Sequence, residues 1–174
     1  FVKRDGGIVW CEVNATVGEF EGSMAVLASM HDITDRKLAA SELARSNSVL
    51  RATLESTADG IIVVDELRNV TAYNEKFLEM WQLSAQVMQT HSNLRLLEII
   101  EDQLADPQQF RSRIEELRAF PNDESYDVIE FKDGRVYERS SQPQLVGGQC
   151  TGRVWSFRDI TERRRAEAMR ADLE

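Results

Sequence analysis

The chain has 174 residues, of which 42% are hydrophobic and 29% are charged, as in ordinary folded globular proteins. Its net charge of −9 disfavours a nucleic-acid or anionic-membrane surface, because both need clustered Lys and Arg. The longest clearly apolar run, Ile61 to Val64, is far too short to span a bilayer, and no signal-peptide pattern is present. We therefore expect a cytoplasmic location, with no nucleic-acid partner and no membrane insertion of this segment.

The first 57 residues predict two strands followed by a helix. Residues 6–17 and 22–33 have strand-like composition, with a turn near Gly18 to Gly22. Residues 35–57 are rich in Ala, Leu, Glu and Arg and contain neither Gly nor Pro, which predicts a helix.

A heptad pattern in this helix leaves two interpretations open. One register places Ala40, Asn47 and Leu54 at a positions and Leu43, Leu50 and Thr57 at d positions. A single Asn at an a position favours a parallel, in-register dimer, so the helix is predicted to dimerise as a coiled coil. The alternative is that the same leucines dock on the sheet of the following domain.

The remaining elements follow in a regular order. Residues 60–65 and 69–74 predict a short antiparallel pair, and Asn74 is placed to cap a helix over 75–81. Two more helices are expected, over 94–104 and from Asp106-Pro107 onward, where Asp is the cap and Pro the first helical residue. Three strands then follow, separated by turns at "KDG" and Gly147-Gly148. The order is β-β-α-α-α-β-β-β, an α+β protein.

An internal repeat explains the organisation of the chain. A shift of 127 positions, without a gap, places "MHDITDRK" on "FRDITERR" and Trp10 on Tyr137. The first copy lacks everything upstream of its last strands. Phe1 lies in a strand pattern and Glu174 in a helical pattern, so we expect the chain to be part of a longer polypeptide. The expected domains are the C-terminal strands of a preceding domain (1–34), a linker helix (35–57), a complete domain (58–160) and the start of an output linker helix (161–174).

The second copy resembles a PAS domain of the PAS/PAC, S-box type. The resemblance rests on the order of elements, on Asn74 after the second strand, and on "FKDGRVYERSSQPQLVGGQCTGRVWSFRDITERRRAE" with its Asp-Ile-Thr. The first copy is similar to the last strands of another PAS domain. Arg68 is a departure, because many PAS domains have Gly at this turn. The resemblance implies an α+β PAS fold, in which a five-stranded antiparallel sheet carries helices on one face and linker helices flank the domain.

What the resemblance implies for function is a signal-sensing and dimerisation module of a multidomain bacterial signal-transduction protein. The expected output is a sensor histidine kinase of a two-component system, with a diguanylate cyclase as the alternative. A ligand-free structural dimerisation spacer is a second alternative from a different class. The expected partner is a second copy, bound through the linker helices.

Two Asp-Ile-Thr segments are the predicted signal-coupling sites: Asp32 with Thr34, and Asp159 with Thr161. Each Thr is expected at the junction of a strand and a helix, where its hydroxyl can cap free backbone N–H groups. The resemblance implies that each junction relays strain in the sheet to the linker helix. A plain helix cap without any coupling is the alternative.

Aromatic and polar residues of the complete domain are candidates for a small-molecule pocket. The candidates are Tyr73, Asn74, Phe77, Met80, Trp81, Tyr137, Trp155 and Phe157. The alternative is a filled core, since apolar stripes at helical spacing usually pack inside proteins. The ligand and any cofactor stay open. His91 lies loosely where haem-binding relatives carry an axial histidine, although a polar loop histidine is more commonly solvated.

Metal and catalytic chemistry have little support in the sequence. Cys11 and Cys150 are too few for a disulfide framework, lack metal-ligand spacing and are expected as buried, reduced thiols. His31 and His91 are the only histidines, so we predict neither a metal site nor a catalytic triad. Any enzymatic activity is expected in an output domain outside these residues.

Overall fold

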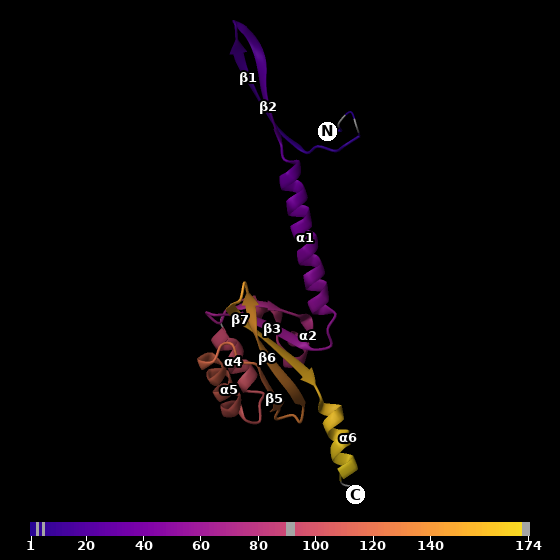
Figure 1. The fold of residues 1–174 in the computed structure, drawn as a ribbon, viewed down its shortest axis with the longest axis vertical. Helices are drawn as coiled ribbons and strands as arrows, with labels where there is room; N and C mark the ends of the chain where they lie inside the picture. The colour runs from indigo at the N-terminus through magenta and orange to yellow at the C-terminus, as the bar shows by residue number, and fades with distance from the viewer. Residues whose placement is uncertain (3, 5, 90–92, 172–174) are drawn as a thin grey trace. The chain divides into compact units, whose positions relative to one another are not determined.

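The computed structural model describes residues 1–2, 4, 6–89 and 93–171 (Figure 1). It divides into two compact units, Phe1–Ala52 and Thr53–Glu174, and each is described by itself. The first unit contains the hairpin of β1 (Cys11–Phe20) and β2 (Ser23–Asp32) and most of helix α1 (Thr34–Glu55).

The hairpin turns tightly at Glu21 and Gly22. Both residues have positive φ, 49° and 76°, which is the backbone of a two-residue hairpin turn of type I′. Gly18 lies inside β1, opposite Ala25, so the predicted start of the turn at Gly18 is wrong. The strand continues past Gly18 because the tight turn needs only the two residues with positive φ.

One face of this hairpin is apolar. Because side chains alternate along a strand, Val13 and Val17 project from the same face as their cross-strand partners Met30 and Val26. All four are exposed, and so is Met24. We call Val13, Val17, Met24, Val26 and Met30 the hairpin apolar face.

The second unit is a sheet with helices. Its elements are β3 (Gly60–Asp65), β4 (Val70–Tyr73), α2 (Glu75–Trp81), α3 (Ala85–Gln89), α4 (Asn93–Glu101), α5 (Pro107–Ala119), β5 (Ser125–Glu130), β6 (Val136–Val146), β7 (Gln149–Asp159) and α6 (Thr161–Ala171). The five strands are antiparallel neighbours in the order β4-β3-β7-β6-β5. The predicted five-stranded antiparallel α+β fold is therefore confirmed, with the short α3 as an additional helix.

Local capping fixes where two of the helices begin. The Asn74 Oδ1 accepts a hydrogen bond from the Phe77 N–H at 3.0 Å, which caps α2. Asp106 caps α5 through the Gln109 N–H at 2.9 Å, with Pro107 in the first turn. Both caps were predicted, because a cap depends only on residues three positions apart.

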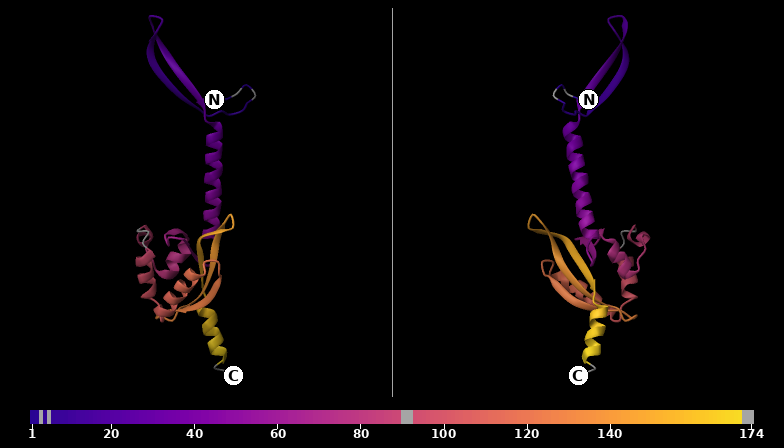
Figure 2. Two further views of the ribbon diagram at one scale, coloured as in Figure 1. Left: turned by 60° about the vertical axis from the view of Figure 1, so that its left-hand side comes forward. Right: turned by 90° about the vertical axis from the view of Figure 1, so that its right-hand side faces the viewer.

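The core lies between the sheet and the helices that cover one of its faces (Figure 2). Trp81 of α2 is at its centre, with 0% of its surface exposed. Its ring lies 5.0 Å from that of Phe131 and 5.1 Å from that of Phe157, and it meets Tyr137 edge-on at 5.9 Å. Such aromatic contacts stabilise the packing beyond simple burial of area.

Candidate functional site

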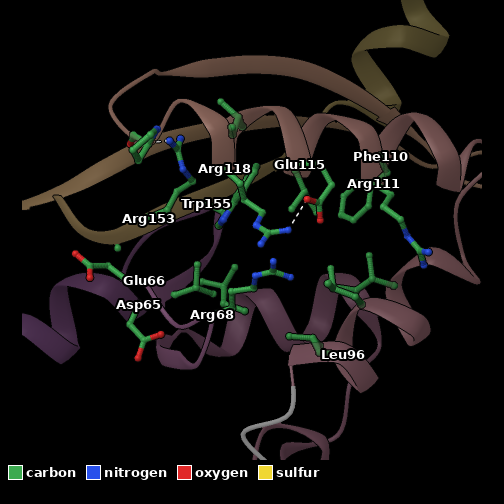
Figure 3. A pocket seen from close by; sticks show the side chains of 18 of the residues that line it. Asp65, Glu66, Arg68, Leu96, Phe110, Arg111, Glu115, Arg118, Arg153 and Trp155 are labelled. Atoms are coloured by element: carbon green, nitrogen blue, oxygen red, sulfur yellow. Dashed lines mark hydrogen bonds and ion pairs between the residues drawn. The ribbon is translucent and has the colours of Figure 1, made fainter.

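A cavity of about 790 Å³ lies between the inner face of the sheet and helices α4 and α5 (Figure 3). This volume is in the range of small-molecule binding sites. Its walls are mainly apolar, and strands β3 and β7 form one of them. The wall residues used below are Ile62, Phe77, Phe110, Ile114, Trp155 and Phe157.

Four arginines border the cavity, and three of them have partners. Arg111 pairs with Glu101, and Arg118 pairs with Glu115. Arg153 donates instead to main-chain oxygens after α5, among them that of Pro121 at 2.8 Å. Carbonyl groups at a helix C-terminus favour a cation, so Arg153 stabilises the end of α5. Burial lowers the pKa of Arg153, which still leaves its guanidinium charged at neutral pH.

Arg68 differs from the other three arginines. Within the part of the chain that the structure describes, its guanidinium has no hydrogen bond or ion pair. Its backbone has a φ of 69°, a conformation that costs a non-glycine residue about 1–2 kcal/mol. The side chain points into the cavity toward Arg118 (Figure 3). The turn thus holds an arginine in a conformation suited to glycine, and directs its charge at the cavity.

Sequence reasoning missed the ion pair of a buried arginine behind the cavity wall. Arg139 of β6 is 0% exposed, and its Nε donates to Asp127 Oδ1 at 2.8 Å on the neighbouring strand. Its guanidinium lies 4.6 Å from the centre of the Phe110 ring and 5.1 Å from that of Trp155. The alternation of β6 contained the signal, since Arg139 lies two residues after Tyr137 and therefore shares its inward face.

The structure brings only part of the predicted pocket residues to the cavity. Phe77, Trp155 and Phe157 line it. The other candidates, which are absent from the lining, are Tyr73, Asn74, Met80, Trp81 and Tyr137. Met80, Trp81 and Tyr137 are buried in the core instead, and a ligand-binding role of the eight residues stays a prediction.

Asn74 uses its side chain for contacts within the protein. Its Nδ2 donates to the main-chain oxygens of Leu54 at 3.0 Å and Asp59 at 2.9 Å. Its Oδ1 accepts from the Ile61 N–H at 2.8 Å and from the Phe77 N–H. The fully buried amide therefore joins the end of α1, the start of β3 and the start of α2.

The junction of β7 and α6 is held by hydrogen bonds to β6. Thr161 Oγ1 accepts from the Val136 N–H at 3.0 Å, and the Ile160 N–H donates to the Val136 main-chain oxygen at 2.9 Å. Asp159 Oδ1 accepts from the Thr161 N–H at 2.9 Å. The structure differs here from the predicted hydroxyl cap: Asp159 accepts the first helical N–H, while the Thr161 hydroxyl faces the neighbouring strand.

The junction of β2 and α1 has the same hydrogen bonds. Thr34 Oγ1 accepts from the Trp10 N–H at 3.0 Å, and Asp32 Oδ1 accepts from the Thr34 N–H at 2.9 Å. The Ile33 N–H donates to the Trp10 main-chain oxygen at 2.8 Å. By these hydrogen bonds Trp10 is equivalent to Val136, whereas the gapless alignment of the two copies pairs Trp10 with Tyr137, one residue later. The one-residue difference is caused by a β-bulge, which adds one residue to the second hairpin. The β6–β7 register shifts at Gln144/Leu145, whereas the β1–β2 register shows no shift.

Over the described ranges, no three His, Cys, Asp or Glu side chains are grouped to hold a metal ion. His91, the haem-ligand candidate, lies outside the described residues. Cys11 and Cys150 are free and half-buried, so the expected full burial of both thiols is wrong. Among the described helices, none is both long and apolar enough to cross a membrane.

The comparisons with known proteins identify the family. A model of the PAS fold matches residues 54–168, well over half of the chain. The chain therefore belongs to the PAS fold family. No match was found among curated proteins.

Three solved structures with the same fold illustrate the similarity. An RNA-binding light-oxygen-voltage receptor has a TM-score of 0.55 at 21% identity, over 73% of this chain and 36% of that one. The PAS domain of Bordetella pertussis BvgS has a TM-score of 0.54 at 19% identity, over 74% and 96%. The sensor region of a sensor histidine kinase has a TM-score of 0.50 at 16% identity, over 87% and 66%. The chain thus spans about a third of the first protein and just under two thirds of the histidine kinase region.

Proposed function

We propose that the chain is the signal-sensing and dimerisation module of a multidomain bacterial signal-transduction protein, and that this protein is a sensor histidine kinase. The observation that carries this proposal is the continuity of β7. Trp155 and Phe157 of this strand line the cavity, and Asp159 at the end of the strand accepts a hydrogen bond from the first N–H of α6. A ligand that contacts the aromatic side chains acts on the strand that positions the output helix.

The four coupling residues are proposed to act as two equivalent junctions. Asp159 with Thr161 would relay strain from the sheet to α6, and Asp32 with Thr34 would do the same for α1. Support comes from the hydrogen bonds that both junctions share. An ion pair between Glu138 of β6 and Arg163 adds a further connection between the sheet and α6.

The domain boundaries in this proposal are those expected from the sequence. Residues 1–34 would be the last strands of a preceding PAS domain, 35–57 a linker, 58–160 the sensing domain and 161–174 the start of the output linker, of which 172–174 lie outside the described residues. The exposed hairpin apolar face supports the first assignment, because an apolar sheet face needs a covering layer. We place the module in the cytoplasm.

Dimerisation is proposed to occur through the linker helices. Leu43 and Leu50, the leucines at the d positions of the heptad register, are exposed on α1. Asn47 lies at the a position between them, where a pair of asparagines fixes a parallel register. The kinase output is chosen over a cyclase because a sensor histidine kinase is among the proteins of similar fold.

Native mass spectrometry of the purified chain, together with its ultraviolet–visible spectrum, tests the proposal. We expect a dimer that carries a small molecule, released on denaturation. Ile114→Trp, which fills the cavity, should abolish the bound mass, whereas Leu145→Trp on the exposed part of β6 should retain it. A dimer without any bound mass in the unmodified chain, even after incubation with metabolite extract, would instead support the ligand-free spacer.

A further inference from the structure

We infer that the cavity takes an apolar molecule that carries one carboxylate, and that Arg68 and Arg118 bind this carboxylate. The inference rests on the proposed sensing function and names the ligand class for the same cavity.

The walls determine the apolar part of the ligand. Phe77, Phe110, Ile114, Trp155 and Phe157 present carbon surfaces from two helices and from β7. Buried polar groups of a ligand would find few hydrogen-bond partners there, and an unpaired buried polar group is unfavourable. A hydrocarbon chain or an aromatic ring system fits such walls, and the volume of about 790 Å³ holds either.

Arg68 determines the head group. Its guanidinium is half-buried, points into the cavity and lacks a partner among the described residues. A carboxylate fits the planar fork of a guanidinium with two parallel hydrogen bonds, which are among the strongest in proteins. The backbone strain at Arg68 is consistent with this role, because glycine would relieve it but would supply no charge.

Arg118 is a second cation of the cavity lining. Its present partner is Glu115, and the side chains of the pair are 48% and 53% exposed. Exposed ion pairs contribute little free energy, so exchange of Glu115 for a ligand carboxylate is inexpensive. In the view into the cavity the Arg68 side chain points toward Arg118 (Figure 3), so that one bound anion would interact with both positive charges.

The acidic residues around the cavity do not favour a cationic ligand. Both carboxylate oxygens of Asp65 accept from Asn69, at 2.7 and 3.0 Å, and Glu101 is paired with Arg111. Glu66 and Glu98 are exposed and therefore hydrated. Arg68 thus lines the cavity without a partner among the described residues, while the acids of the lining are bonded or in water.

Isothermal titration calorimetry with matched probes tests the inference. Decanoate and 2-naphthoate are compared with decanol and 2-naphthol, which have the same apolar bodies without the charge. We expect a carboxylate to bind at least about tenfold more tightly than its alcohol, because hydrogen bonds to charged groups are worth that much or more. Whether decanoate or naphthoate binds better distinguishes a chain-like from an aromatic ligand.

Arg68→Gly and Arg165→Gln separate recognition from net charge. Arg68→Gly removes the guanidinium and relieves the positive-φ strain, so the variant should fold at least as well as the parent chain. We expect it to lose the preference for the carboxylate. Arg165→Gln removes the same charge from α6, outside the cavity lining, and should keep the preference.

Each outcome bears on a defined claim. Equal binding of acids and alcohols, or a preference that survives in Arg68→Gly, would overturn the inference and leave a ligand-binding sensor in place. Failure of all four probes to bind would overturn the inference and count against the proposed sensing function as well.

Discussion

The guanidinium of Arg158, near the end of β7, forms two parallel hydrogen bonds with the carboxylate of Asp59, which precedes β3. The Nε–Oδ1 distance is 2.9 Å and the Nη2–Oδ2 distance is 2.8 Å. The two residues are 99 positions apart in the sequence, and the pair forms because β3 and β7 are neighbouring strands. It joins the first strand of the sensing domain to the last.

Asp59→Asn should lower the melting temperature slightly at low ionic strength, because the Arg158 side chain is 64% exposed and solvent weakens the attraction. At about 1 M salt the difference should disappear, since the screening length is then about 3 Å. Thermal melts at both salt concentrations measure this, with Glu124→Gln as the control, because this exposed carboxylate has no ion pair among the described residues. A loss that is insensitive to salt would contradict an electrostatic role.

Gly152→Ala should separate β3 from β7. A Cβ at Gly152 would lie 2.3 Å from the main-chain oxygen of Val64 and 3.1 Å from the Asp65 Cα, and these backbone atoms cannot yield locally. We expect a loss of about 1–3 kcal/mol in the free energy of unfolding, as for other overpacked sites. Gly18→Ala, in a strand with nothing within 4 Å, should be nearly neutral. Urea denaturation of both variants decides; equal stability would show that the strands can move apart.

Asn74→Ala should destabilise the sensing domain by about 2–3 kcal/mol, because the substitution removes the cap of α2 and leaves buried main-chain groups without partners. The exposed Asn122→Ala, in the turn after α5, should change stability by less than about 0.5 kcal/mol. Urea denaturation followed by tryptophan fluorescence measures both. A small effect at Asn74 would mean that water replaces the amide in the buried site.

Thr161→Val removes the acceptor of the Val136 N–H and with it a connection between β6 and α6. We therefore expect faster hydrogen exchange of the amides at the start of α6. Thr161→Ser keeps the hydroxyl and should behave as the parent chain does. Thr34→Val should act on α1 and leave α6 unchanged. In a full-length protein, Asp159→Ala combined with Thr161→Ala should leave the fold intact and uncouple the output; an output that still responds fully to its signal would disprove coupling.

Stability should decrease above pH 10, in part through Tyr137. Burial raises the pKa of this phenol above its ordinary value, and the nearby Arg135 only partly offsets the effect. A group with a raised folded-state pKa stabilises the protein below its unfolded pKa of about 10 and ceases to do so as the pH rises through the folded value. Tyr137→Phe should therefore flatten the fall in stability above pH 10. The same stability measurement on Tyr126→Phe gives the contribution of the other tyrosine with a raised pKa, because a hydrogen bond with Glu138 raises the pKa of Tyr126.

Local signals made much of the fold predictable from the sequence. The helix caps at Asn74 and Asp106 and the turn at Gly147-Gly148 each depend on a few adjacent residues, and all three are confirmed. The helix α3 was missed because it has only five residues, too few to show an apolar periodicity.

The cavity was less predictable, because it depends on residues far apart in the chain. The sequence shows Arg68 only as a departure from glycine, since a charged residue in a turn is normally solvated. The sequence predicts that the Thr161 hydroxyl caps its own helix, although its hydrogen-bond donor in the structure is the Val136 N–H, 25 residues earlier. Neither the position of Arg68 at the cavity nor the hydrogen bond between Thr161 and Val136 leaves a pattern within a short window of sequence.

The two strand-to-helix junctions also define where such a protein can be cut and rejoined. The side-chain hydrogen bonds that the two junctions share come from Trp10 or Val136, at the start of one strand, and from the Asp and Thr at the end of the next strand. No side chain after Thr34 or Thr161 therefore takes part in them. Recombination immediately after either threonine would therefore exchange everything downstream while keeping each junction complete. A new output would need only a helix in the correct rotational phase.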